Sequence, residues 1–139
     1  MNKLELAKII CKQTHKGQYD RGGKDYYLHP YTVADMCTRK VDKIVAYLHD
    51  VPEDTEITLK DLEKCGFGKR IMNALTAITH IKTMRYYNYL AIVKKNKIAT
   101  RVKIADLVHN SDISRIPNPS EKDKERCKKY LEYIEYLKS

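Results

Sequence analysis

Apolar side chains recur at helical spacing along most of the chain. Residues three or four positions apart share one face of a helix, so such recurrence marks the side that faces a core. Apolar stripes of this kind occupy residues 3–16, 41–50, 69–79, 84–95 and 96–109. No stretch alternates with a period of two for long, and no hairpin signal is present. The pattern predicts an all-α fold of about seven or eight helices.

The remaining helices are indicated by residues that start or stop them. Pro30 suits the first turn of a helix, because a proline there lacks only an N–H that would have no partner. Thr58 and Asp61 have the spacing of a capping box, which predicts a short helix that stops at Gly66. The run Pro117-Asn118-Pro119-Ser120 breaks the chain, and its serine then caps a last helix.

Length and composition place the chain among globular proteins. It has 139 residues, of which 42% are hydrophobic, and only five glycines and four prolines, which predicts one compact domain over residues 1–139. No apolar run approaches the roughly 18–20 residues of a membrane span, and the N-terminus lacks the long apolar core of a signal peptide. The four cysteines form no Cys-x-x-Cys pair, which favours free thiols. We therefore expect a cytoplasmic protein with no membrane partner.

A cluster of polar residues follows directly on an apolar run. His49 and Asp50 come at the end of that run, and Glu53 and Asp54 each follow four positions later. Because Pro52 crowds the preceding turn, we expect the helix to end near Asp50 and the two acids to lie on the turn that follows. Such a cluster is either a solvated helix end or a set of ligands that converge on one ion.

Two further polar positions have alternative interpretations. His29 precedes a helix-starting proline, where it fits a capping or core histidine as well as a ligand. Asp106 lies inside an apolar helix and shares a face with Lys103 and Asn110. Burying an unpaired charge is costly, so this aspartate requires either a salt bridge to a lysine or arginine, or a metal ion.

The charge balance favours anionic partners without choosing among them. Lysine and arginine outnumber aspartate and glutamate by 27 to 18, which gives a net charge of +9. Nucleotides and nucleic acid fit this balance, and so does a solvated lysine-rich surface. Residues 16–25 form a glycine-rich loop with Arg21 and Lys24, and loops of this type can approach phosphate closely. The tyrosines in the stretch 84–95 fit a base-stacking patch or, as we favour, core and rim packing.

Taken together, these motifs resemble an HD-superfamily metal-dependent phosphohydrolase. They are Tyr27-Leu28-His29-Pro30, His49-Asp50 followed by Glu53-Asp54, and Val102–Asp106 followed by His109-Asn110. Their order is similar to that of RelA/SpoT-type hydrolase domains and of stand-alone small alarmone hydrolases, and the resemblance runs from about Leu6 to Arg115. It implies an all-helical domain that uses Mn²⁺ to remove the 3′-pyrophosphate from (p)ppGpp, the alarmone of the stringent response.

The resemblance also implies three groups of site residues. As metal ligands it gives His29, His49, Asp50 and Asp106. As the acidic pair that positions or deprotonates the attacking water it gives Glu53 and Asp54. As contacts of a guanine nucleotide substrate it gives Arg21, Lys24 and Asn110. Mn²⁺ is the implied ion, and Fe²⁺ or Zn²⁺ suit two imidazoles and two carboxylates equally well.

Three positions depart from the family pattern. The loop reads Asp20-Arg21-Gly22-Gly23 where the family has two adjacent basic residues, Pro52 separates the two acidic motifs, and Asp112 stands where basic or hydroxyl residues are usual. Another phosphorylated nucleotide or a dinucleotide is therefore the alternative substrate. A basic helical module that binds nucleic acid or a protein is the alternative class, which we disfavour because the basic residues are spread along the whole chain.

Overall fold

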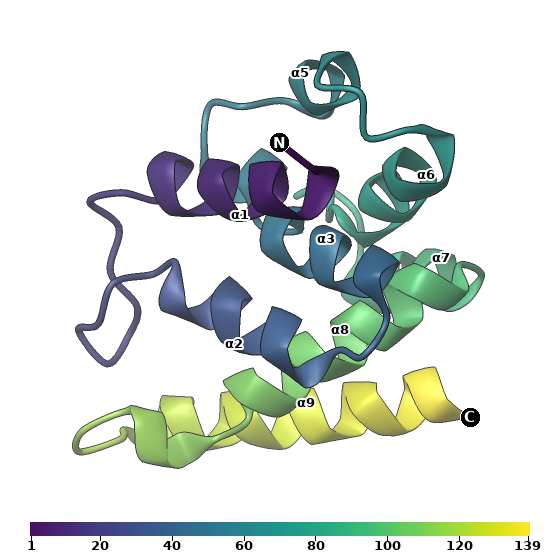
Figure 1. The fold of residues 1–139 in the computed structure, drawn as a ribbon. Helices are drawn as coiled ribbons and strands as arrows, with labels where there is room; N and C mark the ends of the chain where they lie inside the picture. Colours follow the sequence, from purple (N-terminus) through teal and green to yellow (C-terminus); the bar gives the residue numbers. More distant parts are fainter.

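The computed structural model describes residues 1–139, and every regular element in it is helical (Figure 1). The α-helices are α1 (Lys3–Thr14), α2 (Leu28–Met36), α3 (Lys40–Leu48), α4 (Val51–Asp54), α5 (Leu59–Lys64), α6 (Lys69–Ile78), α7 (Tyr86–Lys94), α8 (Lys97–Asn110) and α9 (Glu121–Lys138), and a short 3-10 helix, η1, spans Ile113–Arg115. The predicted all-α fold is confirmed: eight of these helices have six residues or more, and α4 is a single turn.

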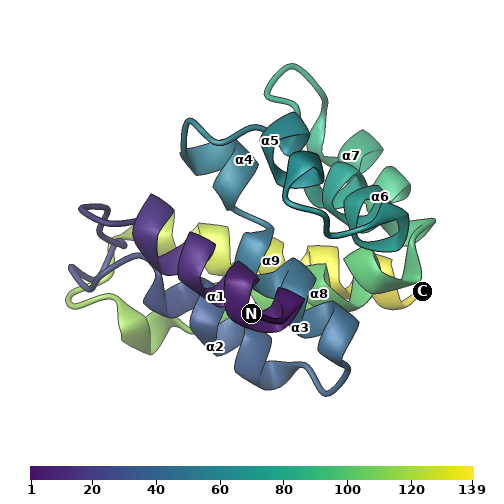
Figure 2. The same ribbon diagram turned by 45° about the horizontal axis from the view of Figure 1, so that its top comes forward.

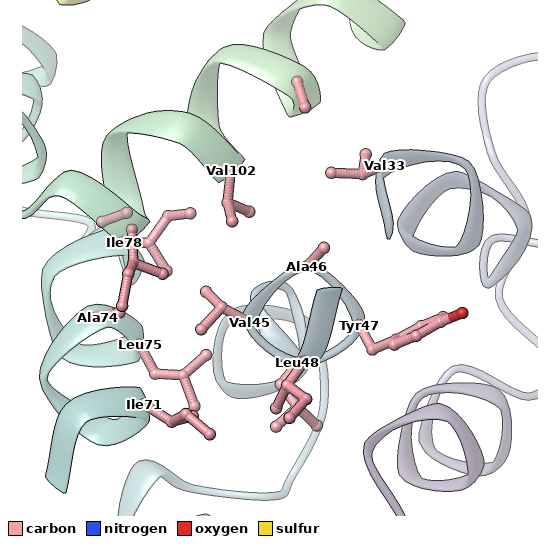
Figure 3. Packing of buried hydrophobic residues seen from close by; sticks show 14 of the residues in the cluster. Val33, Val45, Ala46, Tyr47, Leu48, Ile71, Ala74, Leu75, Ile78 and Val102 are labelled. Carbon is pink, nitrogen blue, oxygen red and sulfur yellow. The ribbon is translucent and has the colours of Figure 1, made fainter. Parts of the chain in front are cut away.

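Helix α3 lies at the centre of the core and contacts α1, α2, α6 and α8. Figure 3 shows its side chains directed outward in several directions: Val45 points to Leu75 of α6, Ala46 points toward α2 and α8, and Tyr47 points away from α6. All residues from Ile44 to Leu48 are buried. A continuous apolar run is required here because this helix has neighbours on nearly every side.

The other helices form two groups around α3 and α8. Figure 2 shows α4 to α7 on one side of the molecule and α1 and α2 on the other. Helix α9 packs against α8, and it also contacts α7 and η1. None of the helices is long and apolar enough to cross a membrane.

Capping residues set the predicted boundaries of α5 and α9. The side chain of Thr58 accepts from the backbone N–H of Asp61, whose carboxylate accepts from the N–H of Thr58. Ser120 and Asp123 make the same reciprocal pair at the start of α9. Each pair satisfies two N–H groups that a helix start leaves without a backbone partner.

The junction between α3 and α4 agrees with the expectation. Helix α3 ends at Leu48, close to Asp50, and Glu53 and Asp54 lie on the turn that follows, which is the helical turn α4. Pro52 occupies the first turn of α4, where its missing N–H has no helical partner to lose. The proline therefore interrupts the chain and restarts a helix, and this fixes the backbone that carries both acids.

An ion pair joins α3 to α8 at the end of α3 remote from this junction. The guanidinium of Arg101 donates from Nε to Oδ2 of Asp42 at 2.6 Å and from a terminal nitrogen to Oδ1 at 3.0 Å. The side chain of Asp42 is only 4% exposed. This two-point contact joins α8 to the first turn of α3, away from the polar cluster described below.

Candidate metal centre

Four polar residues from three segments converge in the interior. His29 lies in the first turn of α2, His49 and Asp50 follow the last residue of α3, and Asp106 lies in α8. Each offers one ligand atom, these atoms all lie within 4.8 Å of one another, and all four residues are buried. The structure thus brings together the four side chains that the sequence motifs single out.

The carboxylate oxygen Oδ1 of Asp106 is the point on which the two histidines meet. It lies 2.7 Å from Nε2 of His29 and 3.2 Å from Nε2 of His49. Oδ2 of Asp50 lies 3.3 Å from Nε2 of His49 and 3.9 Å from Nε2 of His29. The two imidazoles therefore face the two carboxylates with the same ring nitrogen.

The opposite nitrogen of each ring has a fixed partner. Nδ1 of His49 donates to the backbone carbonyl of Ala46 at 2.6 Å, and because a carbonyl only accepts, this nitrogen carries the proton. Nδ1 of His29 lies 2.7 Å from Nδ1 of His109, and the two ring planes are nearly parallel, with an angle of 8° between them. Burial and the nearby Arg115 lower the pKa of His109 to about 4, so its neutral ring can accept a hydrogen bond from Nδ1 of His29.

The geometry requires positive charge between the carboxylates and the imidazoles. Without an ion that charge is a proton: burial lowers the pKa of His49, but Asp50 and Asp106 outweigh it and raise the pKa to about 9. A divalent ion supplies the same charge and would be held by nitrogen and oxygen ligands that suit Mn²⁺, Fe²⁺ or Zn²⁺. The Nε2 lone pairs left free by the outer hydrogen bonds are those that a metal uses. The cluster is therefore a candidate metal site.

Two further side chains contact the carboxylates, Lys103 at the oxygen of Asp106 that faces away from the histidines and Tyr26 at the oxygen of Asp50 that faces them. Nζ of Lys103 lies 3.0 Å from Oδ2 of Asp106, and the hydroxyl of Tyr26 donates to Oδ2 of Asp50 at 2.6 Å. Burial lowers the pKa of Lys103, but the charge of Asp106 outweighs it and keeps the pKa well above its usual value. The salt bridge that the sequence poses as one alternative for Asp106 is thus present on Oδ2, and it leaves Oδ1 facing the two histidines. Tyr26 was missed in the sequence, where only its position three residues before His29 points to it.

The acidic pair lies on α4, at the edge of the cluster. One oxygen of Glu53 accepts from the backbone N–H of His80 at 2.7 Å, and the backbone carbonyl of Asp54 accepts from the side chain of Gln18 at 2.8 Å. Partial burial raises the pKa of Glu53, and the hydrogen bond from the His80 amide opposes this rise without cancelling it. Loss of hydration and the charge of Asp50 raise the pKa of Asp54. Both acids border a surface pocket that also includes Lys82.

A cavity of about 250 Å³ opens beside His29. Its walls come from the loop at residues 19–22, from the segment at residues 110–116 and from α9. Asn110 lies in this wall, and its amide Nδ2 donates to Oδ1 of Asp106 at 3.3 Å. The amide therefore joins the cavity to the candidate metal site, in keeping with the position that the sequence motif assigned to it.

Arg21 and Lys24 lie differently from Asn110. The guanidinium of Arg21 lines the cavity but donates to both carboxylate oxygens of Asp123 in α9, at 3.0 and 3.2 Å. Lys24 is exposed and lies outside the cavity wall. The cavity instead contains Arg115 and Arg126, which sequence reasoning did not single out. No short-range pattern could have found them, because their relation to the loop arises only when η1 and α9 pack beside it.

Close backbone contact fixes the loop against η1. A Cβ atom on Gly22 would lie 2.3 Å from the carbonyl oxygen of Arg115, so only glycine fits at this point. Arg115 also lies 3.4 Å from the carboxylate of Asp20 in the same loop. The glycine-rich loop is therefore tied to the segment after α8 and forms one wall of the cavity.

Comparison with known proteins finds relatives among alarmone enzymes, although no family model matches the chain. It is 27% identical over 126 residues to the bifunctional (p)ppGpp synthase/hydrolase SpoT of Escherichia coli K12, covering 79% of this chain and 18% of that protein. It is 27% identical to the guanosine-3′,5′-bis(diphosphate) 3′-pyrophosphohydrolase of Spiroplasma citri, covering 79% of this chain and 17% of that protein. It is 25% identical to a GTP pyrophosphokinase of Streptomyces coelicolor, covering 95% of this chain and 17% of that protein. The chain thus spans less than a fifth of these relatives' length.

A solved structure shares the fold over nearly the whole chain. It is described as a metazoan ortholog of SpoT that hydrolyses ppGpp, and it matches with a TM-score of 0.76 and 21% identity. The match covers 99% of this chain and 84% of the other. The resemblance to SpoT-type proteins and the all-helical fold expected from it are confirmed.

Proposed function

We propose that residues 1–139 form a single hydrolase domain that removes the 3′-pyrophosphate of (p)ppGpp, giving GDP or GTP and pyrophosphate. The observation that carries the proposal is the buried cluster of His29, His49, Asp50 and Asp106, whose ligand atoms lie within 4.8 Å of one another. The similarity to SpoT-type proteins supports the alarmone as substrate. The four free cysteines fit a cytoplasmic location, where guanine nucleotides occur.

In this proposal the cluster holds one divalent ion, for which Mn²⁺ is the first choice and Fe²⁺ or Zn²⁺ the alternatives. Such an ion supplies positive charge that polarises a phosphoryl oxygen and makes a water molecule more acidic. The chain's own contribution is orientation: Ala46 and His109 fix the outer nitrogens of the two imidazoles, so that both Nε2 atoms face inward.

Glu53 and Asp54 are the proposed proton acceptors. His80 holds Oε1 of Glu53, which leaves Oε2 free to take a proton from the attacking water. The raised pKa of both acids fits this role, because a base is most effective when its pKa approaches the working pH. Their position on the single turn α4 keeps them beside the cluster while leaving them open to solvent.

The cavity beside His29 is the proposed place for the nucleotide, with Asn110, Arg21 and Lys24 as its contacts. Asn110 is well placed, because it lines the cavity and touches Asp106. Arg21 would have to exchange its contact with Asp123 for a phosphate oxygen, and Arg115 and Arg126, which line the same cavity, would likewise exchange their contacts with Asp20 and Asp123. We therefore add these two arginines to the proposed anion-binding groups.

The packing of the tyrosines argues against a nucleic-acid module. Tyr89 is buried, and its hydroxyl donates to the carbonyl of Ile78. Tyr86 packs against Tyr133 of α9 with ring centroids 4.5 Å apart. Of the three, only Tyr87 exposes half of its surface. Single exposed rings are common on protein surfaces, so this stretch offers no platform for stacking successive bases.

The test is release of pyrophosphate and GDP from ppGpp with added Mn²⁺, beside a chelated control at equal ionic strength. Metal-dependent release of both products supports the proposal. A protein that binds metal but leaves ppGpp intact would overturn the substrate and direct the assay to other phosphorylated nucleotides. A protein that binds no metal would overturn the enzyme itself.

A further inference from the structure

The ammonium group of Lys103 lies at the outer oxygen of Asp106. Nζ is 3.0 Å from Oδ2, while Oδ1 of the same carboxylate faces both histidines of the cluster. The two residues are three positions apart in α8, so their contact needs no other element to form. The carboxylate of Asp106 therefore contacts Lys103 through Oδ2 and the two histidines through Oδ1.

Two tyrosines confine this ammonium. Nζ lies 5.5 Å from the ring centre of Tyr89 and 5.8 Å from that of Tyr86, distances typical of cation–π contacts. The Tyr89 hydroxyl is bonded to the Ile78 carbonyl, which holds the ring in place. The Lys103 side chain is only 13% exposed. The tyrosine-rich stretch, to which the sequence assigned no function, thus packs around Lys103, the residue that pairs with Asp106.

We propose that Lys103 is a positioning residue, which occupies Oδ2 of Asp106 so that Oδ1 alone is presented to the metal. This inference rests on the metal site proposed above. A carboxylate can bind a metal through one oxygen or through both, and the partner of its second oxygen decides between these modes. Outer partners of this kind typically change metal affinity by about 10–100-fold when they are removed.

A purely electrostatic role for Lys103 predicts the opposite result. Removing a positive charge beside the site favours the binding of a divalent cation, whereas removing a positioning hydrogen bond weakens it. The sign of the change in affinity therefore separates the two roles. Two substitutions dissect the side chain: Lys103→Met removes both charge and donor, and Lys103→Gln removes the charge but keeps an amide donor. Glutamine and aspartate form hydrogen bonds at this helical spacing.

The experiment titrates metal-free protein with Mn²⁺, and separately with Co²⁺, whose absorption spectrum reports the number and arrangement of ligands. We expect Lys103→Met to weaken Mn²⁺ binding by about tenfold or more and to alter the Co²⁺ spectrum. We expect Lys103→Gln to restore the wild-type spectrum and to bind within about threefold of wild type, as a retained donor allows. Lys103→Ala, which leaves room for water, replaces the methionine variant if that variant does not fold.

Arg101→Met is the matched control, because it breaks the other ion pair of α8 away from the cluster. It should destabilise the protein and leave the metal affinity and the Co²⁺ spectrum unchanged. Metal binding by Lys103→Met that equals or exceeds wild type would overturn the positioning role and leave the proposed enzyme intact. Equal weakening by both Lys103 variants would overturn the hydrogen-bond assignment. Absence of metal binding in the wild type would instead overturn the metal site, and this inference with it.

Discussion

The ion pair between Arg101 and Asp42 allows a quantitative test of how the two helices of the candidate site are held together. Arg101→Met keeps most of the side-chain length but removes both hydrogen bonds to Asp42, whose side chain is 4% exposed. Removing one partner of a buried pair costs about 3–5 kcal/mol, because the other charge stays buried without a partner. Since the Arg101 side chain is 33% exposed, water screens the pair. We therefore expect a loss of about 2–3 kcal/mol.

The assay is urea denaturation followed by circular dichroism at pH 7. With a slope of about 2 kcal/mol per molar urea, typical of small proteins, the midpoint should fall by roughly 1–1.5 M. The double variant Arg101→Met with Asp42→Leu removes both charges and should recover to within about 1 kcal/mol of wild type. A small deficit is expected there because an acid in the first turn of α3 favours that helix by about 0.5 kcal/mol.

Two results would refute this reasoning. A loss below about 1 kcal/mol in Arg101→Met would mean that the pair is worth no more than a surface ion pair. A double variant as unstable as the single one would mean that the cost lies in packing and not in the stranded charge of Asp42.

The remaining predictions concern the cluster and its acids. Asp106→Ala should abolish metal retention in a protein whose circular dichroism stays helical, and an unchanged metal content would remove Asp106 from the site. Glu53→Gln should retain metal but lose pyrophosphate release, and turnover at the wild-type rate would exclude Glu53 as the base. Because Asp50 and Asp106 raise the pKa of His49 to about 9 against the effect of burial, metal must displace a proton below that pH. Affinity should therefore rise with pH towards 9, with proton release in calorimetry, and a flat profile between about pH 6 and 8 would contradict this. The same proton stabilises the metal-free fold: its contribution is complete below the unfolded pKa of about 6.5 and is lost as pH rises through about 9, which thermal melts in chelator should follow.

The parts of the fold that the sequence predicts are those set by local chemistry. Helical spacing identifies the long helices, and the capping box at Thr58 and the capping serine Ser120 place two helix starts correctly. Pro52 correctly marks the end of α3, but the sequence does not indicate that the turn after it is helical, because a proline that ends one helix is equally suited to begin the next.

The sequence predicts those residues of the candidate site that belong to recognisable motifs, and it misses the others. The four residues of the cluster stand in recognisable motifs, and the structure brings them together. The contact of Arg21 with Asp123 spans 102 positions, and no pattern in either segment indicates it. The sequence also does not predict that Arg115 and Arg126 line the cavity, because its walls depend on how η1 and α9 pack. The sequence leaves open whether Asp106 bonds Lys103 or a metal, and only the structure shows that Lys103 takes one oxygen while the other faces His29.

The carbonyl of Ala46 connects the continuity of α3 with the orientation of His49, a proposed metal ligand. In an uninterrupted helix this oxygen would accept from the amide of Asp50, but here it accepts from the ring of His49. Replacing Pro52 with a strong helix former would allow α3 and α4 to join, and the amide would then take the acceptor that fixes the imidazole. An engineer who straightens this junction to gain thermal stability should therefore expect a protein that melts later and holds its metal less tightly.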